Sequence, residues 1–284
     1  MKRQYTIHRA SFGQGLGWLP ASAEIMRRGF KPLTTIAALW LAVSLIVVIP
    51  LVGQVILALL TPLLTAGVLL AFDRLGQGRT PEPTTLFAAW PDPARRRSLL
   101  MLGALGMAGG LSAALILAGW LTAQIGETEL EAAMRSPEAM AEALTGVSLG
   151  GGLLLSALVM SLVLAGLYFA VPLVLFGRAP VGVAVLSSIK AVLVNWIAFF
   201  GFLLALVAVV MGLVFILLLV SSFLGLALGQ VGNFVAQIFL LLSMMLFQVL
   251  MAGAQYLAFS QIFGWSPGLE DEVNPETEDG QYRP

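Results

Sequence analysis

The sequence of 284 residues contains no cysteine and only one histidine, His8. The missing cysteines exclude disulfides, thiolate nucleophiles and cysteine-ligated zinc or iron–sulfur centres. A lone histidine cannot form a histidine cluster around a metal, and the sequence contains no motif typical of catalysis or nucleotide binding. We therefore expect no catalytic residue, no metal and no cofactor, and we expect that the protein is not an enzyme.

Charge is also scarce, since 11% of the residues are charged, 59% are hydrophobic and the mean hydropathy is +0.94. Soluble domains carry about 25% charged residues. Four long stretches carry no charge, and they lie between Lys31 and Asp73, between Arg97 and Glu127, between Glu142 and Arg178 and between Lys190 and Glu270. Because a transmembrane helix needs about 20 apolar residues, these stretches hold two, one, one and two spans. The predicted fold is an all-α, polytopic membrane helix bundle with about six transmembrane helices.

The predicted spans divide the chain into three parts. The spans are Leu33–Ile49, Gln54–Phe72, Ser98–Trp120, Gly151–Phe176, Trp196–Val220 and Asn233–Phe263. Residues 1–32 form a cytoplasmic amphipathic arm, residues 33–263 hold the transmembrane domain, and residues 264–284 form an acidic tail with the composition of a disordered segment. The first two spans are linked by so short a turn that their hairpin either crosses the membrane or is re-entrant. Pro62 and Pro172 lie inside spans and predict kinks.

Basic residues lie on one side of the predicted spans. They concentrate in residues 1–31 and 73–97 and recur at Arg178 and Lys190, whereas Glu127–Glu142 holds five glutamates and one arginine. By the positive-inside rule, both termini and the basic loops are cytoplasmic, and the acidic segment is a short helix on the outer surface. The first apolar run begins after about thirty polar or amphipathic residues and precedes no cleavage pattern, so we expect a retained first span and no signal peptide.

The amino-terminal arm carries apolar residues at helical spacing, namely Phe12, Leu16, Leu19, Ala23, Met26 and Phe30. With Trp18 available for the interface, they predict an amphipathic helix, broken near Pro20, that anchors the arm at the membrane surface; a docking site for a partner is the alternative. Basic residues beside spans bind anionic headgroups at about 1 kcal/mol each. The residues in question are Arg27, Arg28, Lys31, Arg95, Arg96 and Arg97. We expect membrane lipids as partners and no nucleic acid, because these side chains are tied to the bilayer.

The last span carries a row of glutamines, Gln230, Gln237, Gln248 and Gln255, which we call the glutamine stripe. Their spacings of seven, eleven and seven residues return to within about 20° of the same helix face. Buried amides bond between helices at roughly 0.6–2 kcal/mol, so the pattern favours helix packing or self-association, and a pathway for a polar solute is the alternative. Gly103, Gly106, Gly109 and Gly110 in the third span likewise predict close helix contact.

The predicted spans contain no ionisable residue, although intramembrane proteases, proton-coupled carriers and voltage sensors require such residues at depth. Two functions remain. The first is a non-enzymatic assembly, scaffold or accessory component of a membrane, with a protein partner or self-association in the bilayer. The second is a transporter or channel for a small neutral or lipidic solute.

Several short motifs carry a family resemblance. They are the arm from Arg9 to Trp18, the hairpin from Ile49 to Gln54 with Pro62 and Gly67, Leu86-Phe87, the segment from Phe169 to Val174, and the closing Gln261-Ile262-Phe263-Gly264. With these motifs the chain resembles an uncharacterised six-helix inner-membrane family of proteobacteria, which is similar in turn to YciC-like proteins and to the membrane domain of some glycerophosphodiester phosphodiesterases. The resemblance implies a helical bundle in a bacterial inner membrane. It transfers no catalytic residue, because the phosphodiesterase chemistry belongs to a separate soluble domain.

Overall fold

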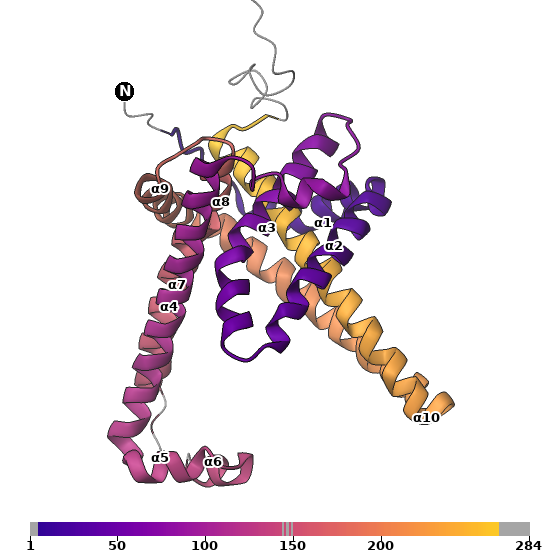
Figure 1. The fold of residues 1–284 in the computed structure, drawn as a ribbon. Coiled ribbons are helices and arrows are strands. Elements are labelled where there is room, and N and C mark those ends of the chain that lie inside the picture. The colour runs from indigo at the N-terminus through magenta and orange to yellow at the C-terminus, as the bar shows by residue number, and fades with distance from the viewer. Residues whose placement is uncertain (1–4, 144, 146–147, 149, 267–284) are drawn as a thin grey trace, which may run out of the picture.

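The structure is a computed structural model that describes residues 5–143, 145, 148 and 150–266 (Figure 1). Every regular element in these ranges is a helix, and none of the described residues forms a strand. The predicted all-α class is therefore confirmed.

The arm forms a single helix, α1, over Phe12–Arg28. Ser11 begins it with a capping box, in which its hydroxyl accepts a hydrogen bond from the Gln14 amide while the Gln14 side chain accepts one from the Ser11 amide. The predicted break near Pro20 is wrong, because α1 continues through this proline. Packing against the last helix compensates for the lost backbone hydrogen bond, and it buries Trp18 to 1% exposure. Trp18 is thus a core residue and does not lie free at the membrane interface.

The first predicted hairpin consists of α2 (Phe30–Ser44), the 3-10 turn η1 (Leu45–Val48) and α3 (Val52–Gly76). Both sides of the hairpin are long and apolar enough to cross a membrane. Its turn is tight, since Leu51 adopts a φ of 62° and the Val52 amide donates to the Pro50 carbonyl at 2.7 Å, as in a γ-turn. Pro62 lies within α3 without ending it.

The next elements are the 3-10 turn η2 (Pro83–Phe87), α4 (Pro93–Ile125), α5 (Glu127–Ala133) and α6 (Pro137–Ala143). The acidic segment thus forms two short helices and not the single one predicted. Helix α4 packs closely where the sequence has glycines. A Cβ at Gly103 would lie 2.6 Å from the Leu59 carbonyl oxygen, and one at Gly109 would lie 2.4 Å from the Val163 side chain. Close helix contact is confirmed at Gly103 and Gly109. A Cβ at Gly106 would lie 3.0 Å from the Leu167 side chain, but at Gly110 the nearest atom would be 3.9 Å away, so Gly110 makes no such close contact.

The fourth predicted span is divided into α7 (Gly150–Tyr168) and α8 (Ala170–Leu175), with the break at Phe169. The loop that we expected to follow contains a further helix, α9 (Val181–Val194). Lys190, which lies within this helix, had contributed to the prediction of a cytoplasmic loop here. Helix α9 is apolar, but its 14 residues are too few for a membrane span.

The last two predicted spans both lie in α10 (Trp196–Phe263), which contains a non-helical residue at Gly229 with φ 57° and ψ −128°. A straight helix of this length would extend for about 100 Å. However, the Phe169 ring lies 5.9 Å from the Phe199 ring and 5.4 Å from the Phe263 ring. The chain therefore turns back at Gly229, and α10 is a hairpin of two antiparallel helices (Figure 1). In the described residues, five helices are long and apolar enough to span a membrane, with α10 counted once.

The elements meet at one end of the molecule and separate toward the other. Figure 1 shows α4 with α7 as one arm, the α10 hairpin as a second arm, and the shorter α2–α3 hairpin between them. The shared end is packed by aromatic rings that include Trp18, Phe169, Phe176, Phe259 and Trp265. Trp265 lies in the segment predicted as the acidic tail, so packed chain extends past the predicted boundary at 264. Residues 267–284 of that predicted tail lie outside the described residues.

Candidate functional site

Gln255 of the glutamine stripe lies against the break between α7 and α8. In a continuous helix the Tyr168 carbonyl would accept a hydrogen bond from the amide of residue 172. Residue 172 is a proline and has no amide hydrogen. The Gln255 side chain of α10 donates to this carbonyl instead. The Gln255 amide thus bonds a backbone acceptor on another helix of the bundle. This is the role that the helix-packing interpretation gives to the stripe.

Ser188 of α9 supports the same break. Its hydroxyl donates to the Ala165 carbonyl at 2.5 Å and accepts from the Phe169 amide at 2.8 Å. These two backbone groups would bond each other in a continuous helix. The inserted hydroxyl keeps both of them bonded while the helix axis changes direction. The Ser188 side chain is fully buried, so the break is built from α7, α9 and α10 together.

The other members of the stripe have different surroundings. Gln248 is half-buried, whereas Gln237 and Gln230 are exposed. Gln237 and Gln230 have no hydrogen-bond partner within the described part of the chain. One further glutamine, Gln261, was not in the predicted stripe, yet its side-chain oxygen accepts from the Trp18 indole at 2.8 Å. The structure therefore brings only the end of the stripe near Gln255 into the packed core.

A buried carboxylate was missed by the sequence interpretation. Asp73, at the end of α3, is 1% exposed and accepts hydrogen bonds from Tyr256 at 2.8 Å, Trp265 at 3.1 Å and Gln77 at 2.8 Å. The neighbouring Arg74 donates to the Thr85 hydroxyl instead. The only sequence signal was an acidic residue directly after an apolar run, with a glutamine one helical turn later.

A second buried polar residue, Asn195, holds the chain that precedes α1. Its side-chain oxygen accepts from the Ala10 amide at 2.6 Å, and its side-chain nitrogen donates to the His8 carbonyl at 3.2 Å. The His8 amide donates to the Ile262 carbonyl at 2.8 Å. Backbone groups of the arm thus form hydrogen bonds with residues at both ends of α10. The polar sequence around His8 did not predict these bonds.

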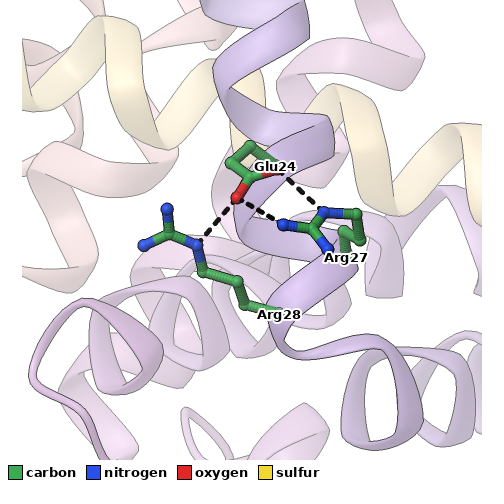
Figure 2. A network of polar contacts seen from close by, with 3 residues as sticks. All are labelled: Glu24, Arg27 and Arg28. Carbon is green, nitrogen blue, oxygen red and sulfur yellow. Dashed lines mark hydrogen bonds and ion pairs between the residues drawn. The ribbon is translucent and has the colours of Figure 1, made fainter.

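The predicted headgroup residues Arg27 and Arg28 share one carboxylate, Glu24, as Figure 2 shows. Glu24 accepts from Nε and Nη2 of Arg27 at 2.9 and 3.0 Å, and from Nε of Arg28 at 2.9 Å. The hydrogen bonds from Arg27 and Arg28 lower the pKa of Glu24 to about 2, so it is anionic at neutral pH. Lys31 is exposed two residues into α2. The group carries a net positive charge at the surface.

The second predicted headgroup cluster, at Arg95, Arg96 and Arg97, lies at the start of α4. The Asp92 side chain caps this helix by accepting from the Ala94 amide at 2.9 Å. Arg96 donates to the Trp90 carbonyl at 3.0 Å, and its guanidinium lies 6.0 Å from the Trp90 ring centre. The cluster adjoins a groove of about 550 Å³ that Arg96 and Arg97 help to line.

No group of three or more His, Asp or Glu side chains that could hold a metal ion occurs among the residues for which the structure gives positions. Comparisons of the chain with protein family models, curated proteins and solved structures found no match. The fold and the apolar helices define a membrane-embedded, multi-pass helical protein.

Proposed function

We propose that this chain is a non-enzymatic assembly component of a bacterial inner membrane, which associates with another membrane helix through the distal half of the α10 hairpin. The observation that carries the proposal is the exposure of Gln237. It lies eight residues after the turn at Gly229, or about 12 Å along the helix. A turn at the membrane surface would therefore leave Gln237 inside the hydrocarbon layer.

An unpaired amide in hydrocarbon is unfavourable, and a polar partner on another helix relieves this cost. The neighbours of Gln237 are apolar and exposed, including Phe234, Ile238 and Leu241. This surface could contact lipid on its own, but the amide favours contact with a protein helix. Because Gln255 is already bonded to Tyr168, the stripe is not left open as a continuous polar route, which weighs against the transport alternative.

The test compares Gln237→Leu with the wild-type protein in lipid nanodiscs and in native membranes. We expect association with itself or with a co-purifying membrane protein to weaken by roughly threefold to thirtyfold, the equivalent of 0.6–2 kcal/mol. The melting temperature of the single chain should stay unchanged, because Gln237 is exposed and has no hydrogen-bond partner within the described residues. Unchanged association in this variant would contradict the proposal, and loss of solute flux with association intact would favour transport.

A further inference from the structure

A groove lies between the carboxyl end of α1 and the α10 hairpin, and we call it the α1 groove. Its volume is about 390 Å³, within the range of roughly 300–1,000 Å³ typical of small-ligand sites. Ala23, Met26 and Phe30 line one side, and Leu213, Phe247 and Leu250 of α10 line the other. The walls are apolar except at two lining residues, Arg27 and Ser243.

The basic group of Figure 2 stands at this groove. Arg27 belongs both to the groove lining and to the group that shares Glu24, and its side chain is 75% exposed. Glu24 uses Nε and Nη2 of Arg27 and Nε of Arg28, so Nη1 of Arg27 and both Nη atoms of Arg28 have no acceptor within the described residues. Guanidinium groups held in this way are suited to bind the oxygens of a phosphate.

Ser243 supplies a second polar group inside the groove. Its hydroxyl has no hydrogen-bond partner in the part of the chain that the structure describes. The lining therefore combines apolar walls, one hydroxyl and the cationic side chain of Arg27. Arg28 does not line the groove, but it shares Glu24 with Arg27 and so adds a second guanidinium beside it. An amphiphile with an apolar chain and an anionic head has the matching distribution of groups.

We propose that the α1 groove binds one anionic phospholipid, with an acyl chain between α1 and the α10 hairpin and the phosphate at Arg27 and Arg28. The charge of the group decides this occupant, since Glu24 offsets only one of the two arginines and Lys31 adds a further positive charge nearby. A zwitterionic headgroup would gain less from this surplus. An apolar protein helix would leave the remaining guanidinium donors unpaired.

The experiment measures lipid retention by native mass spectrometry on delipidated, full-length protein in detergent. Phosphatidylglycerol and phosphatidylcholine are added in equal amounts. The wild-type protein should retain one phosphatidylglycerol in preference to phosphatidylcholine. Arg27→Gln combined with Arg28→Gln should weaken this retention by at least about tenfold, because each basic residue near a headgroup is worth about 1 kcal/mol. Both side chains are exposed, so the double variant should fold.

A second variant tests the acyl chain separately. Ala23→Phe fills the groove while leaving both arginines in place, and it should also lose the retained lipid. Ala21→Phe, on an exposed position of the same helix outside the groove lining, is its matched control and should retain the lipid. Arg178→Gln with Lys190→Gln removes the same charge from exposed positions elsewhere and should have no effect.

Equal retention of the two phospholipids by the wild-type protein would overturn the proposal. Wild-type retention in Ala23→Phe would also overturn it, because the basic residues would then act only at the surface. The groove would instead belong to a protein partner if a stoichiometric protein had to dissociate before lipid could bind. That result would likewise overturn the proposal.

Discussion

The Tyr256 hydroxyl donates a hydrogen bond to the Asp73 carboxylate at 2.8 Å, although the two residues lie 183 positions apart in the chain. Trp265 donates to the same carboxylate oxygen. One buried acid thus joins the end of α3 to the end of α10 and to the first residues after it. Three neutral donors form hydrogen bonds with this carboxylate in place of a cationic partner. A buried acid needs such partners because burial removes it from water.

Asp73→Ala should destabilise the protein by roughly 2–4 kcal/mol, because it leaves the buried Tyr256 hydroxyl and Trp265 indole without their acceptor. Denaturant unfolding in micelles measures the change. Asp92→Ala is the control, since Asp92 caps α4 at the surface and its loss should cost only about 1 kcal/mol. Equal effects of the two substitutions would show that Asp73 is no more than another surface acid.

Gln255→Leu should cost about 1–3 kcal/mol, because the Tyr168 carbonyl loses the hydrogen bond that Gln255 donates at the α7–α8 break. Pro172→Ala restores an amide hydrogen that can reach the same carbonyl. In that background the cost of Gln255→Leu should fall by at least about 0.5 kcal/mol. A double-mutant cycle by chemical denaturation measures this coupling, and strictly additive effects would refute the assigned role of Gln255.

Gly229→Ala should destabilise the α10 hairpin by about 1–3 kcal/mol, since the φ of 57° with ψ of −128° is accessible to glycine and strained for alanine. Gly212→Ala is the matched control. Gly212 lies within the helical part of α10, and a Cβ there would meet no atom within 4 Å, so alanine should leave stability unchanged or raise it by up to about 1 kcal/mol. Thermal unfolding measures the stability of both variants. A greater loss of stability in Gly212→Ala than in Gly229→Ala would contradict this expectation.

The lack of cysteine permits a direct test of the predicted topology. A cysteine in place of the exposed Thr84 of η2 should react with an impermeant maleimide only after lysis of spheroplasts, because this segment is predicted to be cytoplasmic. A cysteine in place of the exposed Glu131 of α5 should react in intact spheroplasts. Labelling with the opposite sidedness would reverse the predicted orientation.

The sequence by itself determined the helical class and the positions of the long apolar elements, because hydrophobic length is a local property of the chain. It also indicated the close contacts of α4, since glycine spacing directly limits how near two helices approach. It separated the two halves of α10 because the uncharged stretch is long enough for two spans, although the geometry of the turn depends on a backbone conformation that composition does not show.

Only the tertiary structure decided which polar groups have partners. The four glutamines of the stripe are equivalent by spacing, yet Gln255 reaches Tyr168 because Pro172 lies in a helix that packs against it, and Gln237 faces outward. Likewise, α1 continues through Pro20 because α10 packs along it, and Asp73 is buried because Tyr256 and Trp265 arrive from the far end of the chain. Hydropathy measures each residue's preference for leaving water, whereas these partners are set by contacts between segments that are distant in the sequence.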